Sequence, residues 1–253
     1  MKSGPITVLT GATRGLGLAM AQQLAKEGGH LISLSRQPVA GLSELAQSHQ
    51  TMLTEIMVDL VDAAALEHAT EQMVKTLAQS AARGSCRIIH NAGIVAPIDQ
   101  AGKLTDLNAI RTAFDVNITA PIYLTAHFLT ATQHCSDRRI MLVSSGAGRQ
   151  AYQSWGVYCA TKAAMDRYAE VIDVEAHANT LVASVAPGVI DTDMQAQIRS
   201  MPESQFPGVD RFVELHQQGA LTPASTTARA MLDLLQSEAF GRHILDDVRT
   251  HTP

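Results

Sequence analysis

The architecture of this chain follows from a short segment near its amino end, Ile6-Thr7-Val8-Leu9-Thr10-Gly11-Ala12-Thr13-Arg14-Gly15-Leu16-Gly17. Residues 6–10 are β-branched or apolar, which predicts a short buried strand that stops at Gly11. Apolar residues at helical spacing then continue as far as Gly28-Gly29. Glycines between a strand and a helix let backbone amides approach a pyrophosphate, and the helix start adds a positive dipole end. The spacing is G-x-x-x-G-x-G and not G-x-G-x-x-G, so a purely structural turn is the alternative interpretation.

Strands and helices alternate along the rest of the chain. Further strands are predicted at residues 30–35, 52–58, 86–90, 139–144, 181–186 and 243–245. Helices are predicted at residues 62–82, 107–132, from Tyr158 to about 177, and from an N-cap at Thr222-Pro223 onward. The pattern predicts one domain over residues 1–253, an α/β Rossmann-type fold with a doubly wound parallel sheet of about seven strands and helices on both faces. Residues 189–218 are expected to form an irregular loop that acts as a substrate lid.

Composition excludes several classes of function. The formal net charge of −5 and the lack of any basic run argue against nucleic acid as a partner. No apolar run reaches membrane-spanning length and the first one is too short for a signal peptide, so we expect no membrane partner and a cytoplasmic location. Ten histidines form no ligand-spaced cluster, so no metal is expected. The three cysteines are odd in number and widely spaced, which favours reduced, buried thiols.

The end of the predicted second strand suggests which cofactor is bound. An acidic residue there would bind the ribose hydroxyls of NAD, but the chain has Ser35-Arg36 instead. An uncharged side chain followed by a guanidinium suits a 2′-phosphate, which favours NADP(H). Arg14 in the glycine turn could supply a second cation. The alternative is that both arginines are ordinary surface charges.

The next two strands also end in residues that could contact a cofactor, because ligands bind at the carboxyl ends of parallel strands. The third is followed by Asp59-Leu60, where Asp59 could accept a hydrogen bond from an adenine amine. The fourth is followed by Asn91-Ala92-Gly93, which is either a cofactor contact or an ordinary turn.

Tyr158 and Lys162 are the candidate acid–base pair. Positions four apart lie on one face of a helix, so both side chains can reach the same substrate atom. A nearby cation lowers the pKa of a phenol, which would make the pair a general acid/base unit. The alternative is a surface tyrosine beside a solvated lysine. Asn117 is a further candidate, because an asparagine inside a predicted helix is disfavoured by propensity.

Together these residues resemble the short-chain dehydrogenase/reductase family, nearly from end to end. The landmarks, in the order of the family, are Thr10-Gly11-x-x-x-Gly15-x-Gly17, Asn91-Ala92-Gly93, Asn117, Ser145, Tyr158-x-x-x-Lys162 and Pro187-Gly188. Ser145 lies thirteen residues before Tyr158, the usual spacing in the family, which favours it over Ser144.

The resemblance implies a role for each landmark. Tyr158 would protonate a carbonyl oxygen as hydride arrives from the nicotinamide, while Lys162 would hold the nicotinamide ribose and lower the phenol pKa. Ser145 would orient the substrate oxygen, and Asn117 would keep a water in a proton relay behind Lys162. Thr192 would hold the carboxamide. The cofactor-binding residues would be Gly11, Thr13, Arg14, Gly15, Leu16, Gly17, Ser35, Arg36, Asp59, Leu60, Asn91, Ala92, Gly93, Tyr158, Lys162, Pro187, Gly188, Val189 and Thr192, and the substrate would contact Tyr152, Trp155 and Met194.

Within the family, residues 185–195 and Leu34-Ser35-Arg36 are similar to the sepiapterin and benzil reductase branch. This resemblance implies NADPH-dependent reduction of a small ketone or diketone. A pterin-anchoring carboxylate near the carboxyl end would fall on Leu245 or Asp246, depending on register. The alternatives are a 3-oxoacyl-thioester reductase and a catalytically idle NADP-binding sensor or scaffold. Family members commonly pair through the helices of Asn117 and Tyr158, so a homodimer or homotetramer is expected.

Overall fold

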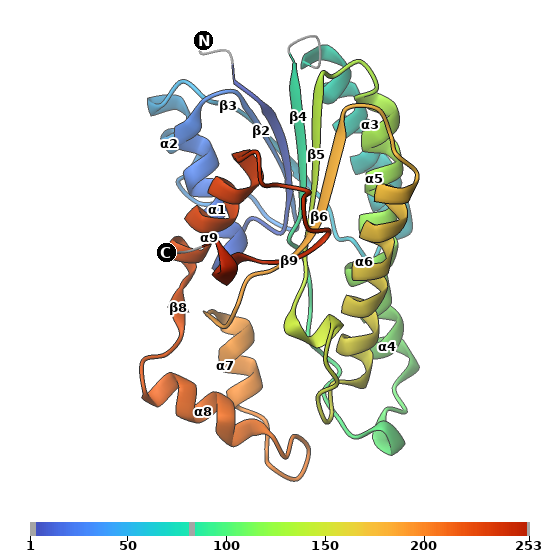
Figure 1. The fold of residues 1–253 in the computed structure, drawn as a ribbon, viewed down its shortest axis with the longest axis vertical. Coiled ribbons are helices and arrows are strands. Elements are labelled where there is room, and N and C mark those ends of the chain that lie inside the picture. Colours follow the sequence, from blue (N-terminus) through green and yellow to red (C-terminus); the bar gives the residue numbers. More distant parts are fainter. Residues whose placement is uncertain (1–3, 81–83, 252–253) are drawn as a thin grey trace.

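The computed structural model describes residues 4–80 and 84–251. Its core is a parallel sheet of seven strands in the order β3-β2-β1-β4-β5-β6-β9 (Figure 1). The strands are β1 (Ile6–Thr10), β2 (His30–Ser35), β3 (Met52–Met57), β4 (Ser85–His90), β5 (Asp137–Val143), β6 (Thr180–Ala186) and β9 (Leu245–Asp247). The predicted doubly wound α/β fold is confirmed. The last strand lies two residues later than predicted.

Helices cover both faces of the sheet, which explains why the central strands are apolar almost throughout. One face is covered by α3 (Ala63–Ser80), α5 (Ala120–Ala131) and α6 (Gly156–Val174), and the other by α1 (Gly15–Glu27), α2 (Leu42–Ser48) and α9 (Ala224–Gln236). Successive strand residues alternate between the two cores: Val8 and Ile88 belong to the first, Leu9 and Ile89 to the second. The helix α2 was not predicted.

The segment expected to be an irregular lid is ordered into secondary structure. It contains β7 (Ile190–Asp191), α7 (Asp193–Arg199) and α8 (Val209–Gln217), and it lies below the carboxyl ends of the strands in Figure 1. Phe206 and Phe212 are buried and pack against Trp155, so burial of aromatic side chains, not exposure, organises this region. The Thr222-Pro223 pair forms β8, which pairs with β7, and the N-cap residue of the following helix is Pro223, one position later than predicted.

The helix predicted over residues 107–132 is interrupted at its centre. It consists of α4 (Leu107–Phe114), a π turn (Asp115–Thr119) and α5. Pro121 in the first turn of α5 has no N–H to donate to the carbonyl of Asn117, so a regular α-helical bond is impossible there. A π turn is a common response to such an interruption and is frequent at functional sites.

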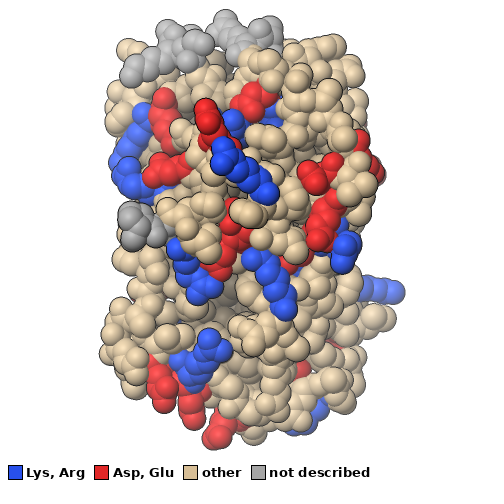
Figure 2. Space-filling view, viewed as in Figure 1, with Lys and Arg blue, Asp and Glu red and all other residues tan. Residues whose placement is uncertain are grey.

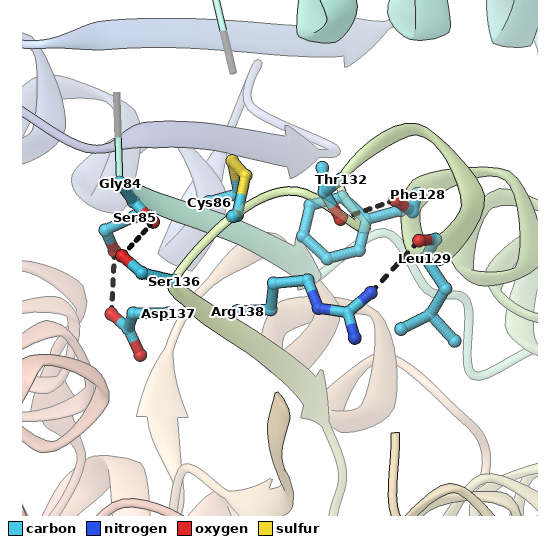
Figure 3. Close-up of a disulfide and its surroundings, with 10 residues drawn as sticks. Gly84, Ser85, Cys86, Phe128, Leu129, Thr132, Ser136, Asp137 and Arg138 are labelled. Carbon is cyan, nitrogen blue, oxygen red and sulfur yellow. Dashed lines mark hydrogen bonds between the residues drawn. A yellow bond between two sulfur atoms is a disulfide. The ribbon is translucent and has the colours of Figure 1, made fainter. Parts of the chain in front are cut away.

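Two of the three cysteines form a disulfide, contrary to the expectation of reduced thiols. Cys86 in β4 is bonded to Cys135, which precedes β5, and the bridge is buried in the first core (Figure 3). The pairing of Ser85 with Asp137 brings the starts of the two strands together, so the Cα atoms of the cysteines are 6.4 Å apart. The two cysteines are separated by 49 positions, so no local sequence pattern indicates that they lie close together. Cys159 is a half-buried thiol.

Among the described helices, none combines the length and the apolar character needed to cross a bilayer.

His90, the last residue of β4, makes folding sensitive to acid. Its Nε2 lies 2.8 Å from Thr125 Oγ1, its Nδ1 has no partner within the described chain, and burial lowers its pKa to about 3. The neutral ring is therefore favoured in the folded protein. Above pH 6.5 the ring is neutral in the folded and the unfolded chain, so the folded state has no disadvantage. As the pH falls from 6.5 toward 3, only the unfolded chain binds the proton, and the free energy of unfolding decreases.

We expect the free energy of unfolding of His90→Met to depend less on pH below 6.5 than that of the unmodified protein. Between pH 6.5 and 4, the free energy of unfolding of the unmodified protein should fall more steeply than that of the variant, by about 1.4 kcal/mol per pH unit. Urea unfolding at pH 7.0, 5.5 and 4.5 measures the difference. His68→Met, at an exposed position of α3, is the matched control and should follow the unmodified protein. Equal slopes for all three proteins would contradict the assignment.

Candidate active site and cofactor cleft

A cleft of about 370 Å³ runs along the carboxyl ends of the strands. Figure 2 shows a hollow at this level of the molecule with Lys and Arg side chains at its border. The cleft is lined by Gly11, Thr13, Arg14, Gly15, Leu16, Gly17, Leu34, Ser35, Arg36, Val58, Asp59, Leu60, Val61, Asn91, Ala92, Gly93, Ile94, Thr112, Val116, Val143, Ser144, Tyr158, Lys162, Pro187, Ile190, Thr192, Asp193 and Met194. Most of the residues predicted to bind a cofactor therefore share one cavity.

The glycine turn is bonded to the segment that follows β4. Asn91 Nδ2 donates to the carbonyl oxygens of Thr10 (3.1 Å) and Gly11 (3.0 Å), and the backbone N–H groups of Asn91 and Ala92 donate to Thr10 Oγ1. Gly17 has no room for a side chain, because a Cβ there would overlap the carbonyl of Gly11 and the amide of Asn91. These contacts hold the turn in one conformation.

The turn leads directly into α1, whose amino end lines the cleft. The N-cap residue Arg14 makes no side-chain capping bond, and no acidic residue lies in the first turn. The first N–H groups of a helix have no partner inside the helix and carry the positive end of its dipole. With Gly11 at φ +73° and Gly15 at φ +54°, the backbone forms a cradle suited to phosphate oxygens.

The ends of β2 and β3 line the same cleft. Ser35 Oγ accepts a hydrogen bond from the N–H of Ala12 at 3.0 Å, so this hydroxyl supports the glycine turn. Arg36 is exposed at the cleft, and Arg14 lies 3.8 Å from Asp193 in an exposed ion pair. Asp59 Oδ1 accepts from the N–H of Val61 at 3.2 Å, which fixes its carboxylate at the cleft wall.

Tyr158 is buried at the start of α6 and makes a hydrogen bond with the side chain of Ser145. Burial raises the pKa of Tyr158 to about 12, and the bond with Ser145 only partly opposes this. We expected Lys162 to lower this pKa. Its Nζ instead lies 5.8 Å from the centre of the Tyr158 ring and donates to the carbonyl of Val143 at 2.8 Å. Burial therefore dominates, and the phenol is neutral.

Lys162 is also buried, and burial lowers its pKa to about 8. A carboxylate on the same helix, Asp166, works in the opposite direction and favours the ammonium. Gly93 leaves the space next to this ammonium: a Cβ there would be 3.6 Å from Lys162 Nζ and 3.4 Å from Asn117 Oδ1.

The side chain of Asn117 holds the segment after β4 against α6. Its Oδ1 accepts from the N–H of Ile94 at 2.9 Å, while Nδ2 donates to the carbonyl of Ile94 (2.9 Å) and to Thr161 Oγ1 (3.1 Å). The buried asparagine thus has a local structural reason, and both amide hydrogens are used within the protein. Its part in a water relay stays a prediction.

The remaining predicted residues are divided between the cleft and its surroundings. Pro187, Thr192 and Met194 line the cleft. Gly188 (φ +79°) packs against the Arg249 side chain, and the carbonyl of Val189 accepts from Thr222, so neither lines the cavity.

Tyr152 and Trp155 belong to an aromatic cluster that includes residues of the segment with α7 and α8. The Trp155 ring stacks on Phe206 at 5.4 Å and meets the edge of Tyr158 at 5.6 Å. The cluster therefore reaches from this segment to the candidate acid.

Leu245 and Asp246, the two candidate pterin anchors, do not line the cleft. Asp246 is buried, and both of its oxygens lie 2.9 Å from His251 Nε2. Leu245 is an exposed apolar residue. Among the described residues there is no group of three His, Cys, Asp or Glu side chains that could hold a metal ion.

Thr112 and Val116 are cleft residues that the sequence interpretation missed. They stand four residues apart in the helix that leads to Asn117, and helical periodicity could have placed them on one face. Val143 and Ser144 were also missed, although they directly precede Ser145.

The chain is similar to proteins of known kind over most of its length. A family model described as short chain dehydrogenase matches residues 5–203. A benzil reductase ((S)-benzoin forming) of Bacillus cereus is 35% identical over 237 residues, which cover 92% of this chain and 94% of the relative. Sepiapterin reductase of Rattus norvegicus is 32% identical, with 94% and 95% covered. Among solved structures, the KRED1-Pglu enzyme has a TM-score of 0.78 at 25% identity, with 95% and 99% covered.

Proposed function

Because this chain belongs to the short-chain dehydrogenase/reductase family, and is therefore an oxidoreductase acting on carbonyl and alcohol groups, we propose that it reduces a small ketone or diketone with NADPH. The observation that carries the proposal is the buried Tyr158, hydrogen-bonded to Ser145, with Lys162 one helical turn away at the same cleft. The two curated relatives support a carbonyl substrate, since their names describe reduction of benzil and of sepiapterin.

The cleft fits a dinucleotide at its glycine turn. Because Gly17 has no side chain, α1 can pack directly against Gly11 and Asn91. The backbone amides at the start of α1 then lie at the cleft. When bound, the nicotinamide cofactor would supply the hydride. Pro187, Thr192 and Lys162, which line the same cleft as Tyr158, would contact its nicotinamide half.

Tyr158 would donate the proton that completes the reduction. A phenol whose pKa is raised to about 12 keeps its proton at neutral pH, so it can transfer the proton to an alkoxide as negative charge develops on the substrate oxygen. Ser145 would donate to the same oxygen and orient it. Burial of Tyr158 strengthens its interaction with this oxygen, because little water competes for its hydroxyl.

The substrate would lie against the aromatic cluster beneath the lid. Trp155, Phe206 and Phe212 pack together at centroid distances of 5.3–5.6 Å, and Trp155 also makes an edge-on contact with Tyr158. Planar apolar groups pack well against such rings. An aryl ketone or diketone therefore suits the site better than a long acyl thioester.

The preference for NADPH rests on the end of β2. Ser35 and Arg36 line the cleft where a carboxylate would select NAD, and Arg14 stands across the glycine turn. A guanidinium binds a phosphate by charge-assisted hydrogen bonds.

Assembly into a homodimer or homotetramer is also proposed. The helices α4, α5 and α6 expose the apolar residues Leu107, Phe114, Ile122, Val171 and Val174, and α5 is apolar around most of its circumference. A helix with such a surface is usually covered by protein.

A substrate panel run with NADPH and NADH side by side tests the proposed function. We expect oxidation of NADPH with benzil-type diketones, and a kcat/KM at least about tenfold higher for NADPH than for NADH. Arg36→Ala should lower kcat/KM for NADPH about tenfold and leave that for NADH unchanged. Arg229→Ala, which removes an exposed arginine from α9, is the control and should behave like the unmodified protein.

Three other outcomes would redirect the proposal. Equal kcat/KM for the two cofactors would show that Ser35-Arg36 does not select a phosphate. Turnover of an acetoacetyl thioester in the absence of diketone reduction would favour a 3-oxoacyl-thioester reductase. Binding of NADPH without turnover of any carbonyl in the panel would favour a sensor or scaffold.

A further inference from the structure

Beneath the candidate site lies a buried carboxylate, Asp166, for which neither the motifs nor the proposed reaction has a role. We propose that Asp166 is a positioning residue that braces the Ser144-Ser145 end of β5 and keeps the Lys162 side chain in its ammonium form. The inference rests on the proposed carbonyl reduction, but part of its test does not require activity.

Each oxygen of the carboxylate is held by groups from other elements. Asp166 Oδ1 accepts from Ser144 Oγ, after β5, and from Ser184 Oγ in β6, both at 2.6 Å, while Oδ2 lies 3.4 Å from Arg149 Nε. Asp166 is only 4% exposed. The carboxylate therefore ties the ends of two strands and the turn at Arg149 to helix α6.

The turn after β5 closes over this carboxylate. Gly148 has no side chain, and a Cβ there would be 2.7 Å from Asp166 Oδ2 and 2.9 Å from the carbonyl carbon of Lys162. Ser144 directly precedes Ser145, whose side chain bonds to Tyr158. Fixing Ser144 therefore fixes the position of the hydroxyl that we assign to the substrate oxygen.

The only cation of the candidate catalytic group, Lys162, lies on the same helix as the carboxylate. Lys162 and Asp166 are four residues apart on α6, both buried, and share one face of the helix. An opposite charge nearby favours the charged form of a buried amine, which otherwise loses its proton easily. Burial lowers the pKa of Lys162, and the charge of Asp166 raises it again in part, as expected for this pair.

Arg149 is a second charged side chain next to Asp166, with its Nε 3.4 Å from Oδ2. The pKa of the neighbouring carboxyl Asp247 is lowered mainly by its hydrogen bond with Arg249, at 2.6 Å, and to a smaller extent by the charge of Arg149.

Asp166→Asn tests the proposal, because it keeps the size and the oxygen acceptor but removes the charge. Two measurements are made: the pH dependence of kcat/KM with NADPH and a diketone, and the titration of Lys162 Nζ by NMR with labelled lysine. We expect the pKa of Lys162 and the alkaline limb of the profile to move down by about one pH unit or more. Activity at pH 8.5 should then fall about tenfold further than activity at pH 6.

Asp173→Asn, an exposed position on the same helix, is the matched control and should shift neither measurement. A uniform loss of activity at every pH, with the Lys162 titration unchanged, would overturn the proposal and leave Asp166 a structural residue. If Asp166→Asn does not fold, the unmodified protein still decides: a measured pKa of Lys162 below about 6.5, where burial outweighs the carboxylate, would overturn it. The NMR titration is independent of turnover, so failure of the proposed reaction would be recognised separately.

Discussion

Tyr158→Phe is expected to lower kcat for ketone reduction by about 10³-fold while the Kd for NADPH changes by less than about threefold. The substitution removes one oxygen from a ring that is buried and stacked edge-on against Trp155. The ring itself keeps its packing, so the fold and the cofactor cleft should be preserved. What is lost is the only phenol at the described cleft, and with it the proton that the proposed reaction delivers to the substrate oxygen.

Steady-state kinetics at saturating NADPH and a fluorescence titration of NADPH separate the two quantities. Tyr168→Phe is the matched control, because Tyr168 lies on the same helix and burial raises the pKa of its phenol as well. The control should retain nearly full activity. If Tyr158→Phe still turned over at a rate close to that of the control, Tyr158 would not be the proton donor.

Gly17→Ala is expected to have the second large effect, this time on cofactor binding. A single methyl group at this position would overlap the backbone of Gly11 and the side chain of Asn91, which together hold the glycine turn. Overpacking of this kind costs about 3 kcal/mol, so the melting temperature should fall by about 6–12 °C. If the glycine turn instead shifts to make room for the methyl group, the cofactor site is distorted, and the same free energy corresponds to a Kd for NADPH about 100-fold higher.

Thermal unfolding with and without NADPH, together with the NADPH titration, measures both effects. Gly102→Ala is the control: a Cβ there meets no atom within 4 Å, and its backbone is not in the left-handed region. It should change neither quantity. A Gly17→Ala variant with the stability and NADPH affinity of the control would contradict the close packing of α1 against Asn91.

The central part of the fold could be predicted because local patterns and topology agree. Short runs rich in β-branched and apolar residues, such as residues 6–9 and 86–90, form strands with both faces covered, and they alternate along the chain with segments of helical periodicity. Parallel strands place their carboxyl ends on one edge, so Gly11, Ser35, Asp59 and Asn91 had to meet at one cleft. This rule alone was enough to place these residues at one cleft, without information on contacts between distant side chains.

The features that were missed depend on contacts between distant segments. The disulfide joins residues that only the β4–β5 register brings together. The helices α7 and α8 are organised by Trp155 and Tyr158, far away in sequence. The pKa of Tyr158 was predicted in the wrong direction, because spacing reveals the neighbouring lysine and says nothing about desolvation.

The π turn at Asp115–Thr119 also determines how α5 is rotated about the helix axis relative to α4. A π turn holds about one residue more than an α-helical turn, so removing one residue here would bring the winding closer to that of an α-helix, whereas removing one residue from a regular turn of α4 would rotate Ala120–Ala131 by about 100°. After that rotation, Phe128 and Leu124 would leave the core, and the outward-facing Ile122 would turn toward the sheet. Among close homologues, loss of one residue should therefore be tolerated better within Asp115–Thr119 than in the regular turns of α4.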